Sequence, residues 1–277
     1  MSLRFAYNTN GTASHRLDDA LVLMHEAGYD GVALTLDVNH FDPFAPDWER
    51  ATERLARRLS ELKLGSVIET GARYLLDPRA KHEPTLVTAS AEGRARRVAF
   101  LERAIAIGAM LGSEAVSFWA GVPKPGVDRD EARRWLAEGL ARVVEHASAA
   151  GIDAALEPEP GMLIETVDDY AALAVPGLRL ALDTGHCLVT GERDPAAAVR
   201  EFAERIATVS LEDMKRGEHV HLAFGDGDMD VPSVLDALEA VGFDRLVCVE
   251  LSRDSHRADT MIPAAMRYMG ECRRAAA

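Results

Sequence analysis

Short apolar runs alternate with longer amphipathic segments eight times along this chain of 277 residues, and this alternation restricts the fold more than any single motif. The apolar runs are expected to form strands at residues 3–7, 31–36, 66–69, 115–119, 152–157, 178–183, 206–212 and 246–251. Apolar residues recur at helical spacing between them, which predicts helices at 16–26, 48–62, 91–111, 128–149, 167–173, 231–241 and 259–273, and one that begins at Asp194.

Strands that are apolar along their whole length are typical of a parallel sheet with both faces covered. Eight strand–helix units that close on themselves form a (β/α)8 TIM barrel, and we predict this α/β fold as a single domain over residues 1–277. An open doubly wound sheet is the alternative. It is less favoured because no GxGxxG motif follows the first expected strand.

The balance of charges and the cysteine content exclude several classes of partner and location. The net charge of −14 would repel a nucleic-acid backbone, and no cluster of Lys and Arg with interleaved aromatic residues is present. No apolar run approaches the roughly 18 residues of a membrane span. The three widely spaced cysteines argue against a disulfide framework and fit a reducing compartment. We therefore expect a cytoplasmic protein that binds a small molecule, with no nucleic-acid or membrane partner.

Four of the expected strands end on an acidic residue: Glu157, Asp183, Glu212 and Glu250. In a TIM barrel the carboxyl ends of all strands meet on one rim, where active sites lie. Carboxylates that are close together and partly buried repel one another, and a divalent cation is the natural compensation. Oxygen ligands favour Mn²⁺, Mg²⁺, Co²⁺ or Zn²⁺, and the absence of cysteine ligands disfavours a structural zinc site.

Three histidines are candidates for the same cation. His186 follows Asp183 by three residues, and His219 and His221 alternate, so they share one side of an extended segment. Imidazole is a common metal ligand, which makes a His-x-His pair near an acidic cluster an indication of metal binding. The alternatives are a satisfied core histidine at 186 and a solvated loop at 219–221.

Other residues near the expected strand ends are candidates for substrate binding. A polar stretch at residues 71–90 is long for a loop in a compact domain, and such loops are usually lids or binding loops. An aromatic side chain at the rim could stack on a sugar ring, and rim cations could hold a phosphate or carboxylate. Together with His186, the substrate-binding candidates are His40, Glu69, Arg73, Trp119, Arg216 and Arg253.

Four motifs in this order resemble those of the xylose-isomerase-like TIM-barrel superfamily, the sugar phosphate isomerase/epimerase group. They are LEPEPG at 156–161, LDTGH at 182–186, HLAFGDGDMD at 221–230 and VEL at 249–251. The resemblance implies that Glu157 and Glu250 are both metal ligands and the catalytic acid/base pair. It also implies that Asp183 is a ligand and that His186 lies beside the metal or binds a substrate hydroxyl.

The chain departs from the family pattern on the seventh expected strand. The family usually has a histidine ligand two residues before the position of Glu212, and this chain has Ser210 there. Either Glu212 takes over that role, because residues i and i+2 share a strand face, or His219 or His221 folds into the site. His221 matches the histidine that precedes the family's GxG turn.

These observations favour a divalent-metal-dependent isomerase or epimerase acting on a sugar, sugar phosphate or cyclitol. Glutamate would transfer a proton at the carbon next to a carbonyl. The alternatives are a metal-dependent hydrolase or lyase with a multi-metal site like that of endonuclease IV but a substrate other than DNA, and a non-catalytic barrel that binds a metabolite or a metal. The oligomeric state is left open, although the resemblance implies that homo-oligomers are common.

Overall fold

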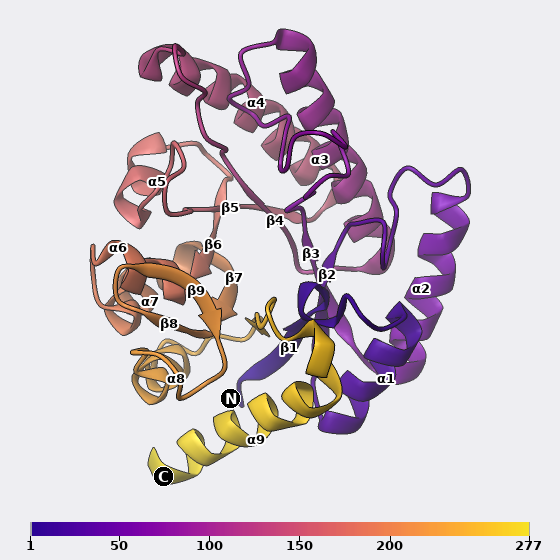
Figure 1. Cartoon of the computed structure of the whole chain (residues 1–277), viewed down its shortest axis with the longest axis vertical. Helices are drawn as coiled ribbons and strands as arrows, with labels where there is room; N and C mark the ends of the chain where they lie inside the picture. The colour runs from indigo at the N-terminus through magenta and orange to yellow at the C-terminus, as the bar shows by residue number, and fades with distance from the viewer. Residues whose placement is uncertain (1, 277) are drawn as a thin grey trace.

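Eight parallel strands close into a barrel in the computed structural model, which describes residues 2–276. Their order around the barrel is β1-β10-β7-β6-β5-β4-β3-β2, so the predicted (β/α)8 fold is confirmed (Figure 1). Residues 1 and 277, the ends of the predicted domain, lie outside the described residues. The barrel strands are β1 (Arg4–Asn8), β2 (Gly31–Thr35), β3 (Gly65–Glu69), β4 (Ala115–Trp119), β5 (Asp153–Glu157), β6 (Arg179–Asp183), β7 (Ile206–Leu211) and β10 (Leu246–Val249).

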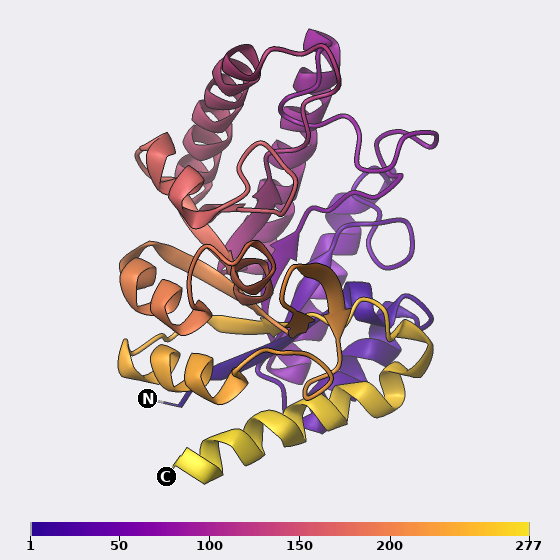
Figure 2. The same ribbon diagram turned by 60° about the vertical axis from the view of Figure 1, so that its left-hand side comes forward.

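Helices follow the strands and cover the outside of the barrel (Figures 1 and 2). The helix α9 packs beside both α8 and α1, which brings the two ends of the chain together and completes the ring. Within residues 2–276, no helix is long and apolar enough to cross a lipid bilayer. The helices are α1 (Leu17–Ala27), α2 (Trp48–Leu62), α3 (Ala91–Leu111), α4 (Arg129–Ala150), α5 (Val167–Leu173), α6 (Thr184–Thr190), α7 (Pro195–Phe202), α8 (Val231–Ala240) and α9 (Ala258–Ala276).

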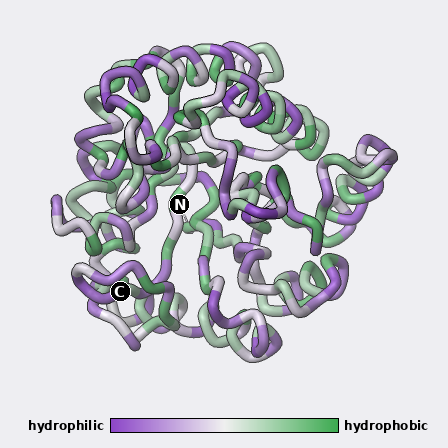
Figure 3. The backbone as a smooth tube through the Cα atoms, turned by 45° about the horizontal axis from the view of Figure 1, so that its top comes forward, coloured by the Kyte–Doolittle hydropathy of each residue, from purple (hydrophilic) through white to green (hydrophobic). Residues whose placement is uncertain are grey.

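The core follows from the sequence periodicities. Hydrophobic and hydrophilic residues alternate along the helices (Figure 3), and α2 buries Leu55, Leu59 and Leu62 on one face. The strands are buried on both faces, as expected of a parallel sheet. One face packs against the helices, and small side chains form separate buried clusters, including one made of Ala115, Ala155, Ala181 and Ala207.

The structure differs from the sequence prediction where two strands meet the rim. The expected strands 206–212 and 246–251 end at Leu211 and Val249, so Glu212 and Glu250 lie just beyond the ladder. A helix that was not predicted, α6, begins directly after β6. Its first turn is capped by Asp183, whose Oδ1 accepts a hydrogen bond from the backbone N–H of His186 at 3.0 Å. The chain after β7 forms an antiparallel hairpin, β8 (Asp213–Lys215) and β9 (Glu218–Leu222).

Candidate active site and metal centre

A cavity of about 300 Å³ opens at the carboxyl ends of the barrel strands. This is the end of a TIM barrel at which active sites lie. Nine of the residues predicted from the sequence line it together: Glu69, Arg73, Trp119, Glu157, Asp183, His186, His219, His221 and Glu250. The strand register places neighbours side by side, with Trp119 paired with Glu157 and Asp183 paired with Ser210.

The other predicted residues do not line this cavity. Glu212 is fully buried beside it, in contact with His221. His40 turns away, because the Asp37 carboxylate accepts its backbone N–H and its ring Nε2 donates to the carbonyl of Thr12 at 3.2 Å. Arg216 and Arg253 are exposed.

Glu157, Asp183 and His186 form the first group of possible metal ligands, with one donor atom from each within 4.8 Å of the others. The His186 Nδ1 donates to the carbonyl of Pro158 at 2.9 Å, which fixes the ring and directs its Nε2 toward Asp183 Oδ2, 3.4 Å away. Asp183 Oδ2 is buried and has no hydrogen-bond partner within the described part of the chain. A carboxylate oxygen in that position is available to a cation.

Glu212, His221 and Glu250 form a second group. His221 Nδ1 donates to Glu212 Oε2 at 2.6 Å, and Asn10 Nδ2 donates to Glu250 Oε1 at 2.7 Å. The second oxygen of Glu212, Oε1, is buried without a hydrogen-bond partner among residues 2–276. Strand β7 has Ser210 where the family usually has a histidine ligand, and it contains no other histidine. Glu212, which directly follows β7, and the imidazole of His221 are the nearby groups that could take this role.

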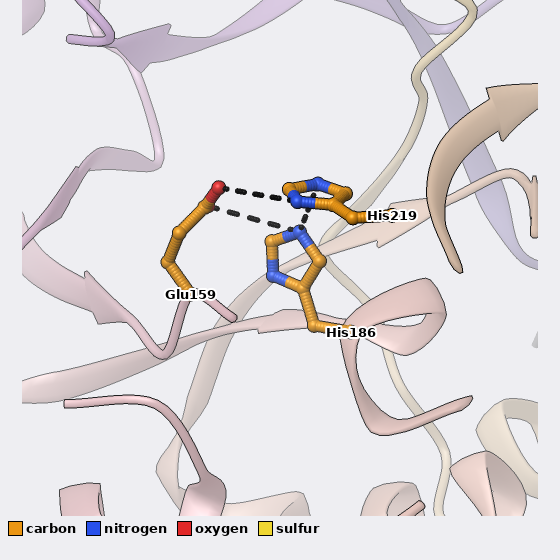
Figure 4. A group of neighbouring side chains, drawn as sticks. All are labelled: Glu159, His186 and His219. Atoms are coloured by element: carbon orange, nitrogen blue, oxygen red, sulfur yellow. Dashed lines mark hydrogen bonds and ion pairs between the residues drawn. The ribbon is translucent and has the colours of Figure 1, made fainter. Parts of the chain in front are cut away.

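Glu159, His186 and His219 form a third group, drawn in Figure 4. The Nε2 atoms of the two histidines are 3.2 Å apart, and Glu159 carboxylate oxygens lie 3.7 Å from His186 Nε2 and 3.8 Å from His219 Nδ1. Glu159 was not among the predicted site residues. The signal that could have found it is its position two residues after Glu157, since alternate residues of an extended segment share a side.

The electrostatics of the cavity are those of crowded carboxylates. Burial, with the charge of Glu250, raises the pKa of Glu69 to about 8, and burial, with the charge of Asp183, raises the pKa of Glu159 to about 7. Burial also raises the pKa of Glu157 and of Glu212 well above the usual range. In the part of the chain that is described, histidines are the only basic side chains at ion-pair distance from these acids.

A divalent cation fits this donor set. Carboxylate oxygens and imidazole nitrogens are the ligands that Mn²⁺, Mg²⁺, Co²⁺ and Zn²⁺ take in proteins. The buried oxygens of Asp183 and Glu212 that lack partners need a positive charge or a donor, because an unpaired buried carboxylate is strongly unfavourable. The residues present therefore match a metal centre in both charge and chemistry.

The hairpin that carries His219 and His221 is anchored by the buried Asp213, which was not predicted from the sequence to have a role. Asp213 is 1% exposed. Its Oδ2 accepts backbone N–H groups from Gly225 and Gly227 at 2.8 and 3.0 Å, and its Oδ1 accepts that of Met229 at 3.0 Å. A Cβ on Gly227 would lie 2.2 Å from Asp213 Oδ1, so glycine permits this close wrapping. The backbone of the GxG motif at residues 225–227 thus binds the carboxylate of Asp213.

We expect Asp213→Asn to lower the free energy of unfolding by about 2–3 kcal/mol, because an amide group replaces one acceptor and leaves backbone donors unsatisfied. Chemical denaturation measures this change. Asp226→Asn is the matched control, since Asp226 lies in the same turn with an exposed side chain. Equal stability of the two variants would contradict the anchoring role of Asp213.

The comparisons with known proteins agree with the barrel fold. The family model described as "Xylose isomerase-like TIM barrel" matches residues 21–272. The chain belongs to this family. It is 29% identical to the L-ribulose 3-epimerase of Mesorhizobium japonicum over 84% of this chain and 74% of that protein. It is 28% identical to the inosose dehydratase of Lacticaseibacillus casei over 49% of this chain and 52% of that protein.

Solved structures show the same fold. The IOLI protein, crystallised with a bound zinc atom, superposes with a TM-score of 0.75 at 16% identity, over 98% of this chain and 96% of that one. At this level of identity the likeness supports the architecture of the family member and leaves its substrate open.

Proposed function

We propose that this protein is a divalent-metal-dependent isomerase or epimerase of a sugar, sugar phosphate or cyclitol, working by proton transfer at the carbon next to a carbonyl. The observation that carries the proposal is that Glu157 and Glu250 line one cavity together with a set of metal-binding donors. The epimerase among the relatives supports the reaction class.

Glu157, Asp183 and Glu250 would hold the cation, together with His186 or with the paired Glu212 and His221. When bound, such an ion polarises a carbonyl and an adjacent hydroxyl, which makes the neighbouring carbon-bound proton more acidic.

In this proposal the two glutamates serve opposite faces of a substrate. Glu157 ends β5 and Glu250 follows β10, and two strands, β6 and β7, separate these strands around the barrel. One carboxylate removes the proton and the other returns a proton from the far side, which inverts the configuration at that carbon. Asn10 fixes the orientation of the Glu250 carboxylate through its 2.7 Å hydrogen bond.

Hydrogen exchange tests the proposal directly. The metal-loaded protein is incubated in D₂O with a panel of ketopentoses, ketohexoses, their phosphates and inososes, and deuterium at the carbon next to the carbonyl is followed by NMR. We expect incorporation with at least one substrate class, abolished by EDTA and restored by Mn²⁺ or Co²⁺. Absence of exchange across the panel in protein shown to contain metal would count against the proposal.

A lyase reaction is the second candidate, because one relative is an inosose dehydratase. The same proton would be removed, and a hydroxyl group would then leave from the adjacent carbon with a proton supplied by an acid. Glu159, with a pKa of about 7, is an additional acid in the cavity that could supply it. The products discriminate the two reactions, because only the lyase releases water and forms a product lighter by that mass.

A further inference from the structure

Most acids that line the cavity and its Arg and Lys side chains come from different parts of the barrel mouth. With the exception of Glu69, which ends β3, the carboxylates and the histidines of the hairpin belong to β5, β6, β7 and β10 and the segments that follow them. Two cations, Arg73 and Lys81, also line the cavity, and both belong to the loop between β3 and α3. In the order of the closed barrel, β3 lies directly across from β7. The two basic side chains therefore come from the side of the barrel mouth opposite β7 and its hairpin, and they share that side with Glu69.

The loop holds these cations in a strained but well-connected conformation. Arg73 has a φ of 38° and His82 has a φ of 67°, values that side-chain-bearing residues seldom adopt. The backbone N–H of His82 donates to the carbonyl of Arg73 at 2.6 Å, and His82 Nδ1 donates to the carbonyl of Gly71 at 2.7 Å. Backbone strain of this kind persists only where surrounding contacts enforce it and is concentrated at ligand-binding segments.

Neither cation is committed to a carboxylate. Within residues 2–276, Arg73 and Lys81 form no ion pair, although acids outnumber bases 45 to 31 in the chain. Lys124, on the loop between β4 and α4, is different, because it forms an ion pair at 2.7 Å with Glu83 of the β3–α3 loop. A half-buried guanidinium without an ion-pair partner, with the exposed ammonium of Lys81 lining the same cavity, is suited to bind an oxyanion, because charge-assisted hydrogen bonds to phosphate or carboxylate are strong.

We propose that the substrate carries an anionic group, a phosphate monoester or a carboxylate, at the end remote from its reacting carbons, and that Arg73 and Lys81 bind this group. The proposal rests on the proposed function and narrows its substrate class. The carbonyl end would lie among the metal ligands, and the anionic end would lie under the β3–α3 loop. A neutral sugar leaves the two cations without a partner, so the site discriminates against it.

Binding of ligands that cannot react tests this assignment without requiring turnover. The metal-loaded protein is titrated by calorimetry with ribitol, D-ribitol 5-phosphate and D-ribonate, which share a five-carbon chain and lack a ketone or aldehyde group. We expect at least one of the two anions to bind roughly tenfold or more tightly than ribitol, and added NaCl to weaken that preference. Preference for the phosphate ester would identify a phosphate subsite, and preference for ribonate would identify a carboxylate subsite. Equal binding of all three ligands would overturn the proposal.

Variants separate this subsite from attraction of the anion to the metal. We expect Arg73→Gln and Lys81→Gln each to reduce the preference for the anion, the double variant to abolish it, and Arg73→Lys to retain part of it. Arg79→Gln is the matched control, because Arg79 is exposed on the same loop and does not line the cavity. A preference unchanged in the folded double variant would place the anion elsewhere. Exchange into neutral ketoses without any preference for anions would refute the subsite alone, whereas anion binding without exchange on any substrate would refute the proposed function alone.

Discussion

We expect Glu157→Gln and Glu250→Gln each to lower the rate of substrate carbon–hydrogen exchange by roughly two to four orders of magnitude, the usual contribution of a positioned acid or base. Glutamine keeps the shape of the side chain and a carbonyl oxygen that can still ligate a cation, but it cannot accept the proton. The measurement is deuterium incorporation from D₂O at fixed metal and substrate concentrations. Because both residues act at the same carbon in successive steps of one reaction, the double variant should be little slower than the more impaired single variant.

Metal content must be measured on the same samples, because both glutamates are also proposed ligands. A variant that retains its metal but loses exchange has lost the acid or base. A variant that loses both has lost the site. Glu145→Gln, an exposed change on α4, is the control and should leave both quantities unchanged. Exchange at the original rate in metal-loaded Glu157→Gln and Glu250→Gln would contradict their role as the acid/base pair.

The parts of the site that could be predicted are those fixed by strand topology. Glu157 and Asp183 end apolar runs, and parallel strands bring such ends together whatever their separation in the sequence. Glu159 is different, because it follows the strand and its direction depends on how the chain turns between Pro158 and Pro160. Its spacing from Glu157 could make it a candidate, but the contact with His186 and His219 depends on the folded loop.

The reverse error occurs at His40, and Arg97 shows a burial that its place on a helix does not predict. His40 follows a strand and was expected near the substrate, but the Asp37 carboxylate caps the turn and the imidazole is directed toward Thr12. Arg97 stands on α3, where an arginine is normally exposed, yet it is fully buried. Its Nη2 donates to the carbonyl of Thr70 at 3.0 Å, and its guanidinium lies 4.5 Å from the centre of the Trp119 ring. Such contacts depend on tertiary neighbours that a single helix's periodicity cannot supply.

Removal of the metal should lower the thermal stability of the protein substantially. Carboxylates of Asp183, Glu157 and Glu212 are buried close together, and without a cation they must repel one another or take up protons. A ligand present at a thousand times its dissociation constant stabilises the native state by about 4 kcal/mol. At roughly 2 °C per kcal/mol for a chain of this size, EDTA is expected to lower the Tm by about 8 °C.

Differential scanning fluorimetry with EDTA, followed by addition of Mn²⁺, Co²⁺, Mg²⁺ or Zn²⁺, measures this shift and ranks the four ions. Asp183→Asn is the informative variant, because it removes both a proposed ligand and a source of repulsion. Its metal-free form should unfold at or above the temperature of the metal-free parent, while its response to added metal should be smaller. The two changes together distinguish a cation held by these side chains from a general effect of chelator or salt. A Tm that does not respond to EDTA, in protein first shown to contain metal, would mean that the buried carboxylates are satisfied in some other way.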